Sequence, residues 1–323
     1  MSHLRSHRNF GIISMASGAA AAALKARAAA WEVPLVETAE TLSLFVWGCE
    51  LRLVPGGDHV RIELTAPEAR LIGNLQDSAT ELFADAGLHV HWDRVDAGAL
   101  APGLSLMRVQ SVMGRSPGFI RVRLAGPDAV RFGRGSLHFR LLLPPAGRAA
   151  VWPRIGASGR TEWPDGADAL HRPVYTVADQ QGDWLDFDIF RHAGSPTCDW
   201  ASSGPEGATV GVIGPGGGWC PDAERLHLFG DETALPAIAR MLDLAGGEVT
   251  AHVRAGYPDL GPLAADPRVS RCDDLMAALA ALDLGPGAFV WFAGEAGQAR
   301  QARQHLLARG MDRKAFTTAA YWG

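Results

Sequence analysis

The sequence predicts a multidomain protein with a small α+β domain, an antiparallel β-barrel and a C-terminal doubly wound α/β domain. Three patterns along the 323 residues carry this expectation. Short strands surround a long helix in residues 12–97, strands with little helical pattern fill 104–203, and strands alternate with helices in 204–323. A chain of this length is expected to form two or three domains.

The first domain is expected to have four short strands and one long helix. The helix is predicted over residues 66–86, where apolar residues recur on one face. The strands are predicted at residues 43–47, 50–54, 59–65 and 89–92.

The N-terminus loosely resembles a secretory signal peptide, because Arg5 and Arg8 precede an apolar run and an alanine-rich stretch. Lys25 and Arg27 interrupt that run, so Ala19–Ala30 fits an amphipathic helix better. No segment reaches the ~20 apolar residues that a membrane span needs. We therefore expect a cytoplasmic protein that does not enter a membrane.

Composition narrows the classes further. A net charge of -5 gives no reason to expect a nucleic-acid partner. The four cysteines are scattered without a C-x-x-C pattern, which predicts neither a zinc site nor a disulfide framework. His89 and His91 share a strand face on which a metal could bind, but no third ligand is apparent nearby. We expect an exposed histidine pair and no metal site.

The barrel is expected from strands with polar turns between them. Phe119–Leu124 alternates apolar residues with arginine, so one face is buried and the other wet. Residues 104–191 hold twelve arginines, no lysine and eight acidic residues. This positive excess has two interpretations, a mouth that attracts anionic ligands or a solvated outer face of the barrel. The other barrel strands are predicted at 136–144, 173–177 and 184–190.

The last block alternates strands with helices, which favours a parallel sheet. Strands are predicted at 210–213, 226–229, 248–254 and 288–292, and helices at 234–245, 273–282 and 296–309. The glycine-rich turn 214–218 is interpreted either as a phosphate cradle or as a plain connector.

Two strand ends carry the clearest functional signal. The strand before Gly230 is followed by Thr233, a natural N-cap, and by Pro236 in the first helical turn. Free amides and the helix dipole at such a turn suit a phosphate. Gly294–Glu295 repeats the layout, so the two strand ends predict a nucleotide crevice at one sheet edge.

These residues carry a family resemblance. The run 230–240, the A-G-E-A turn at 293–296 and the terminal Tyr321–Trp322 resemble siderophore-interacting proteins, which are flavin-dependent ferric-siderophore reductases built like ferredoxin reductases. The resemblance covers residues 104–323. Residues 12–97 resemble a small α+β domain of unknown function that is often fused ahead of such proteins, through Ala66–Glu68 and Val90–Trp92.

The resemblance implies a function. FAD would take a hydride from NADPH or NADH and pass single electrons to Fe(III) in a ferric siderophore, which then releases Fe(II). This reaction needs no catalytic acid, base or nucleophile, and the sequence has no G-x-S-x-G or H-E-x-x-H motif. We expect a monomer. Two alternatives stay open: a siderophore- or iron-binding protein that has lost the flavin, and a flavin reductase or diaphorase with another acceptor.

The flavin motif of the family, R-x-Y-T-x-R, is only partly present. Tyr175 and Thr176 match, whereas Pro173 and Ala178 stand at the arginine positions and Arg172 is one residue out of register. We therefore expect weaker FAD binding than the full motif gives. The residues that the resemblance assigns to FAD are Arg172, Tyr175, Thr176, Val177, Arg191, His192, Thr197, Cys198 and Trp322.

The nicotinamide side is better preserved. Arg254 ends a predicted strand where a 2′-phosphate could lie, and Arg271 is an alternative, so NADPH and NADH both stay open. The residues expected at NAD(P)H are Gly230, Asp231, Glu232, Thr233, Ala234, Arg254, Gly294 and Glu295.

Overall fold

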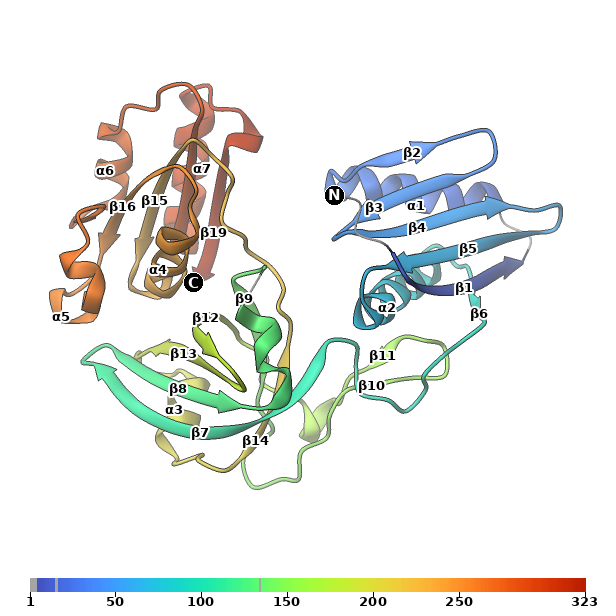
Figure 1. The fold of residues 1–323 in the computed structure, drawn as a ribbon, viewed down its shortest axis with the longest axis horizontal. Coiled ribbons are helices and arrows are strands. Elements are labelled where there is room, and N and C mark those ends of the chain that lie inside the picture. Colours follow the sequence, from blue (N-terminus) through green and yellow to red (C-terminus); the bar gives the residue numbers. More distant parts are fainter. Residues whose placement is uncertain (1–4, 15–16, 134) are drawn as a thin grey trace. The chain divides into compact units, whose positions relative to one another are not determined.

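The computed structural model describes residues 5–14, 17–133 and 135–323 (Figure 1). The chain forms two compact units. The first unit is Met1–Leu104 with Pro144–Leu170, and the second is Ser105–Leu143 with His171–Gly323. Within the described ranges, no helix is long and apolar enough to cross a membrane.

The first unit is a six-stranded antiparallel sheet packed against two helices. The strand order is β2-β3-β4-β5-β1-β6. Helices α1 (Ser17–Trp31) and α2 (Ala69–Asp85) pack on a shared core, to which α1 contributes Ala20, Leu24 and Ala28 at a spacing of one turn. The strands are β1 (His7–Ser14), β2 (Leu35–Glu37), β3 (Leu42–Val46), β4 (Cys49–Pro55), β5 (His59–Ala66) and β6 (His91–Trp92).

The sequence predicts this unit well except for β2 and for the N-terminal strand β1. The stretch that resembles a signal peptide contains β1, which pairs with both β5 and β6. Met15, at the end of that stretch, lies outside the described residues. The helix expected from residue 66 begins at Ala69, because Ala66 is still paired with His7 in the sheet.

Residues between the barrel strands also belong to the first unit. The Trp-Pro-Arg loop, which resembles part of the flavin-binding barrel, leads into β10 (Arg154–Ile155). That strand pairs with β11 (Thr161–Glu162) in a separate two-stranded sheet, and Arg154 forms an isolated bridge with Leu100. A short 3-10 helix follows at Gly166–Asp168. This loop therefore adds no strand to the barrel.

The barrel of the second unit is closed, in the order β12-β13-β8-β7-β14-β9. Aromatic and aliphatic side chains fill it, among them Phe139, Phe187 and Val122. A 3-10 helix (Pro127–Gly133) follows β8, and α3 (Pro196–Ser202) lies between β13 and β14 in the sequence. The strands are β7 (Leu104–Ser116), β8 (Phe119–Ala125), β9 (His138–Leu142), β12 (Val174–Gln181), β13 (Trp184–Phe190) and β14 (Thr209–Ile213).

One strand is placed differently from the prediction. Residues 210–213 were expected to open the α/β domain, but β14 pairs with β9 and closes the barrel. An apolar run of this length has the same pattern in either sheet, so the sequence could not assign its partner. The glycine-rich turn at 214–218 is a connection that folds back on β9, since Leu137 and His138 donate to Gly218 and Gly217.

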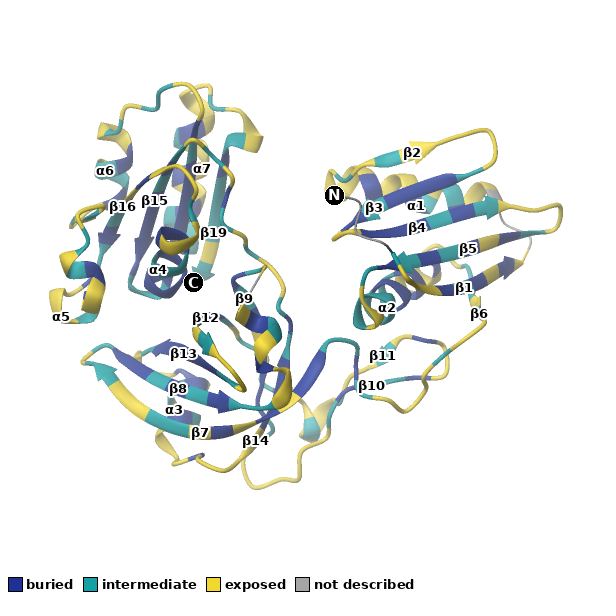
Figure 2. Ribbon diagram, in the orientation of Figure 1, coloured by how far each residue is buried: buried dark blue, intermediate teal, exposed yellow. Residues whose placement is uncertain are grey.

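The C-terminal part is a five-stranded parallel sheet in the order β17-β16-β15-β18-β19. The order reverses between β15 and β18, as in a doubly wound fold. Helix α4 belongs to one apolar cluster and helices α6 and α7 to another, so both faces of the sheet are covered. Buried strands stand between more exposed helices and loops (Figure 2).

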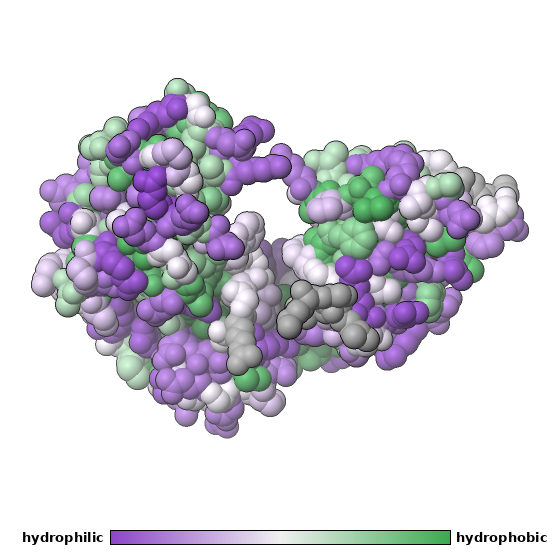
Figure 3. All heavy atoms as spheres, turned by 45° about the horizontal axis from the view of Figure 1, so that its top comes forward, coloured by the Kyte–Doolittle hydropathy of each residue, from purple (hydrophilic) through white to green (hydrophobic). Residues whose placement is uncertain are grey.

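The strands of this sheet are β15 (Arg225–Asp231), β16 (Glu248–Arg254), β17 (Val269–Arg271), β18 (Ala288–Glu295) and β19 (Phe316–Trp322). The helices are α4 (Leu235–Leu244), α5 (Tyr257–Leu260), α6 (Leu275–Ala281) and α7 (Ala296–Ala308), with 3-10 turns η3 (Glu232–Ala234), η4 (Gly261–Ala265) and η5 (Arg313–Ala315). The fold class expected from the sequence is confirmed. On the face seen in Figure 3, hydrophilic residues are interspersed with smaller hydrophobic patches, as on most exposed protein surfaces.

Candidate functional site

Asp231 is the central residue at the carboxyl edge of the sheet. It ends β15 and is fully buried. Its Oδ1 accepts hydrogen bonds from the amide and hydroxyl of Thr233 at 3.0 and 2.6 Å, and its Oδ2 accepts one from the indole of Trp322 at 2.8 Å. Gly294 lies against it, since a Cβ there would come within 2.7 Å of Oδ2. Two predicted strand ends therefore meet as expected.

The two helix N-termini at this edge do not form the predicted phosphate sites. Asp231, not Thr233, caps the first turn after β15. Glu295 caps α7 by accepting from Gly297 and Gln298 at 2.6 and 2.9 Å, and these bonds lower the pKa of its carboxyl. Carboxylates already occupy these amides and would repel a phosphate. The amides of Thr233, Gly297 and Gln298 are therefore not free for an anion, contrary to the prediction.

Two arginines lie on the neighbouring strand ends. Arg254 ends β16, and its Nη2 is 3.8 Å from Oδ2 of Asp231. Arg271 ends β17, donates to the carbonyl of Ala255 at 3.0 Å and pairs with Asp273. The side chain of Arg254 is about one-third exposed, at 31%. The edge therefore has acidic groups at β15 and β18, and basic groups at β16 and β17.

A hydrogen-bonded chain joins this sheet to the barrel. The hydroxyl of Tyr321, on β19, lies 3.1 Å from Nε2 of His138, and Nδ1 of His138 lies 3.0 Å from the hydroxyl of Thr176 on β12. The backbone of Gly218 packs against the ring of His138, since a Cβ on Gly218 would lie 2.5 Å from Nε2. Burial lowers the pKa of His138 to about 4 and raises that of Tyr321. His138 is therefore neutral near pH 7.

Acid is expected to destabilise the protein through His138. In the unfolded chain His138 takes up a proton near its ordinary pKa of 6.5, whereas in the folded chain it does so only near pH 4. The free energy of unfolding should therefore be highest above pH 6.5 and fall by about 2–3 kcal/mol towards pH 4. Urea unfolding across this range measures the fall.

His138→Gln keeps an amide between Thr176 and Tyr321 without a titrating ring, so its profile should be flatter by about 2 kcal/mol. His91→Gln, at an exposed position, is the control and should leave the profile as it is. An equally steep profile in His138→Gln would contradict the expectation.

Tyr175 of the flavin motif lies on the opposite side of β12 from Thr176, because neighbouring strand residues alternate in direction. The ring of Tyr175 packs 4.9 Å from that of Phe187, and its hydroxyl bonds to Thr197. Burial raises the pKa of Tyr175 to about 12. Nε2 of His171 lies 2.9 Å from the Thr197 hydroxyl. Ser195 caps α3 by accepting from the amide of Cys198 at 3.2 Å, which fixes Thr197 in its first turn.

The structure separates the residues expected at FAD into groups. Val177 is in the barrel core, so only its backbone can face a ligand. Arg191 and His192 follow β13 and Arg172 precedes β12, and all three are exposed. Trp322 is bound to Asp231 and so belongs with the residues expected at NAD(P)H. Within the described ranges Arg191 has no acidic partner. Its guanidinium group therefore suits a cofactor that carries phosphates.

Several barrel arginines are paired with aspartates on the outer face of the barrel. Asp188 pairs with Arg121 and Arg115, and Asp186 pairs with Arg123. Arg123 also lies over the ring of Trp184 at 3.6 Å. These three arginines are 18–34% exposed, which agrees with the interpretation of a solvated outer face. Arg134, one of the twelve arginines, lies outside the described residues.

Sequence reasoning missed His138 and His171. His138 is the first residue of β9 and His171 precedes β12, neither has a motif around it, and their partners are distant in sequence. Both metal candidates, His89 and His91, are exposed, and the described part of the chain has no group of three or more metal-ligating side chains. The four cysteines are free thiols.

A closed six-stranded antiparallel barrel joined to a five-stranded parallel α/β sheet is the architecture of ferredoxin-reductase-like proteins. Residues 108–219 match the siderophore-interacting FAD-binding domain, and residues 223–323 match the siderophore-interacting protein domain. The chain belongs to the siderophore-interacting protein family.

Known relatives agree with this assignment. The ferric vibriobactin reductase ViuB of Vibrio cholerae is 30% identical over 158 residues, which are 45% of this chain and 55% of that protein. The match thus spans about half the length of this curated relative. A siderophore utilization protein from T. fusca is 26% identical with a TM-score of 0.56, covering 71% of this chain and 95% of that one. SipS from Aeromonas hydrophila, at 24% identity, TM-score 0.55 and coverages of 68% and 91%, shares the fold.

Proposed function

We propose that this protein is a ferric-siderophore reductase that uses FAD and takes electrons from NADPH or NADH. The observation that carries the proposal is the series of hydrogen bonds from Thr176 through His138 to Tyr321. It joins β12, the strand of the flavin motif, to β19, the last strand of the parallel sheet. The family match and the name of the Vibrio relative support the siderophore as substrate. The reaction is proposed to take place in the cytoplasm, in a monomer.

The barrel is proposed to hold FAD, and we extend this domain from residue 104 through β14. Tyr175, Thr176 and the first turn of α3 at Thr197 and Cys198 would contact it. Arg191, His192 and Arg172 supply the charges that its phosphates need. Bound FAD would accept a hydride and release electrons singly to Fe(III). Since Pro173 and Ala178 lack the motif charges, we expect FAD to bind more weakly than with a full motif.

The carboxyl edge of the parallel sheet is proposed to hold the nicotinamide nucleotide. Glu232 and Glu295 are acceptors that suit ribose hydroxyls or a carboxamide N–H, and the buried Asp231 holds Thr233 and Trp322 in place beside them. Arg254 and Arg271 suit its phosphates. The capped helix ends exclude phosphates from β15 and β18, so these groups are proposed to lie over β16 and β17.

A visible absorption spectrum of the purified protein tests the proposal. Bound flavin is expected, and its absence even after reconstitution with FAD would favour the binding-protein alternative. Stopped-flow mixing of the reduced protein with ferric siderophores and with other acceptors separates the remaining two functions. Faster reoxidation by an iron-free acceptor than by every ferric chelate would favour a diaphorase.

Arg254→Ala is expected to lower the preference for NADPH over NADH by about tenfold, if Arg254 contacts the 2′-phosphate through one charge-assisted bond. The ratio of kcat/KM for the two donors is the measurement. Arg303→Ala on the exposed face of α7 is the matched loss of charge and should leave the ratio unchanged. An unchanged ratio in Arg254→Ala would move the assignment to Arg271.

A further inference from the structure

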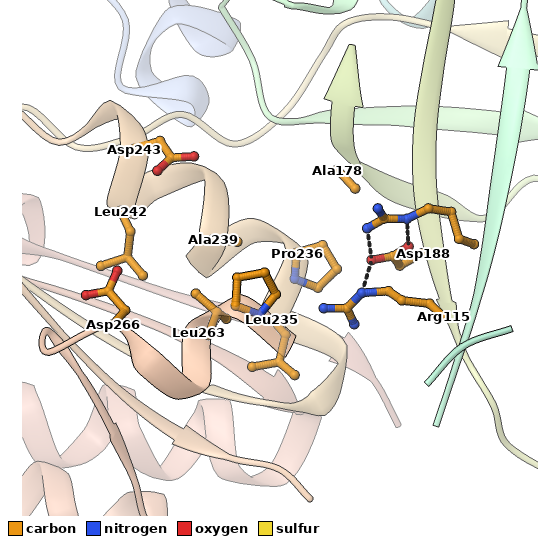
Figure 4. A pocket seen from close by; sticks show the side chains of 12 residues that line it. Arg115, Ala178, Asp188, Leu235, Pro236, Ala239, Leu242, Asp243, Leu263 and Asp266 are labelled. Atoms are coloured by element: carbon orange, nitrogen blue, oxygen red, sulfur yellow. Dashed lines mark hydrogen bonds and ion pairs between the residues drawn. The ribbon is translucent and has the colours of Figure 1, made fainter. Parts of the chain in front are cut away.

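A cleft of about 310 Å³ lies between the outer face of the barrel and helix α4 (Figure 4). Arg115, Arg121, Ala178 and Asp188 form its barrel wall. Ala178 stands at an arginine position of the flavin motif, whereas the other three are not among the residues assigned above to FAD or NAD(P)H. Small-molecule sites in proteins begin at about this volume.

On the barrel wall, two arginines lie against one buried aspartate. Asp188 accepts two hydrogen bonds from Arg121, at 2.7 and 2.9 Å, and its Oδ2 lies 3.3 Å from Nε of Arg115. Two guanidinium groups thus share one carboxylate. Nη1 of Arg121 makes no hydrogen bond with another described residue, so it is available to an anion.

The opposite wall is mostly apolar, but Asp243 and Asp266 also line it. Leu235, Pro236, Ala239 and Leu242 on α4 line it together with Leu263 of η4. The acidic side chains of Asp243 and Asp266 lie farther along α4 and η4 (Figure 4), and Asp266 is paired with Arg268. A ligand with one anionic group and an apolar body satisfies both walls, whereas a second anionic group near these acids would be repelled.

Ala178 keeps the cleft open. Its side chain lines the cleft on β12, at the position where the R-x-Y-T-x-R motif has an arginine. An arginine there would fill part of the space and bring a third guanidinium beside Arg115 and Arg121. The departure from the motif therefore creates room and leaves a single charge to be matched.

We propose that this cleft binds a small aromatic or aliphatic monocarboxylate, with the carboxylate at Arg121 and the apolar body against α4. The ligand binds beside the flavin site, at the motif position that Ala178 leaves open, and displaces neither cofactor. The ligand is a second, non-reacting molecule at the junction of the barrel and the α/β domain.

Isothermal titration of the full-length protein with benzoate tests the proposal. Benzoate should bind at least tenfold more tightly than neutral benzyl alcohol, because the alcohol lacks the charge-assisted bond. Cationic benzylamine should not bind, and the dianion phthalate should bind more weakly than benzoate. Equal affinities for benzoate and benzyl alcohol, or no saturable binding of benzoate, would overturn the proposal.

Two variants that fill the cleft locate the binding. Ala178→Leu and Ala239→Leu fill it from opposite walls without changing charge, and each should weaken benzoate binding at least tenfold. Val174→Leu, at an exposed position on the same strand, should bind as the wild type does. Wild-type affinity in both cleft variants would overturn the proposal, as would release of bound flavin by benzoate in the visible spectrum.

Discussion

Replacing Asp188 by alanine is expected to lower the free energy of unfolding by about 3–5 kcal/mol. The Asp188 side chain is only 3% exposed and holds two arginines on the outer face of the barrel. Removing it leaves Arg115 and Arg121 partly buried, next to each other and without their shared carboxylate. The loss should exceed that of a single hydrogen bond because two charges lose their partner. Urea unfolding at pH 7 is the measurement.

Two comparisons make the expectation specific to the paired charges. Asp186→Ala should cost less, since its partner Arg123 is more exposed and keeps its contact with Trp184. Replacing Asp188, Arg115 and Arg121 together by apolar residues should recover most of the loss, because no buried charge then stays unpaired. A loss below about 1 kcal/mol in Asp188→Ala would show that solvent screens the arginines.

Most of the fold could be predicted from local patterns. The prediction failed where a local pattern indicates a strand but not the strand with which it pairs. The alternation of Phe119–Leu124 gave a barrel strand with one wet face, and β8 has that form. The run 210–213 gave a strand as well, but its pairing with β9 depends on barrel closure. Likewise, the apolar N-terminal run is equally compatible with a leader peptide and with β1.

The site was predictable in part. Asp231 and Glu295 were placed at the right edge, because carboxyl ends of parallel strands meet there. Their use as helix caps was missed, although an acidic residue before a helix is itself a capping signal. The contact of His138 with Tyr321 spans 183 residues, and no local pattern encodes it.

The charge pairs on the outer face of the barrel could have been predicted from the sequence. Arg121 and Arg123 alternate on one strand, and Asp186 and Asp188 alternate on another. In antiparallel register each arginine faces an aspartate, Arg121 opposite Asp188 and Arg123 opposite Asp186. The count of charges showed an excess of arginine, but only this register shows which arginines are paired on that face.

Asp231→Ala is expected to lower the free energy of unfolding by about 3–4 kcal/mol, since three hydrogen bonds to a buried carboxylate are lost together. The change also removes the cap of the turn that leads into α4 and releases the indole of Trp322. Glu232→Ala, the neighbouring acid outside this network, is the control and should change stability by less than about 0.5 kcal/mol.

A double-mutant cycle with Trp322→Phe isolates the bond between Asp231 and the C-terminal strand. The phenylalanine keeps an aromatic ring but has no N–H to donate, so the two changes should be non-additive by about 1 kcal/mol. Urea unfolding of the four proteins gives the coupling free energy. Strict additivity would mean that Trp322 is held by packing alone, and a loss below about 1 kcal/mol in Asp231→Ala would mean that water replaces its bonds. With the coupling present, Asp231 fixes the last strand at the sheet edge where the nicotinamide nucleotide is proposed to bind.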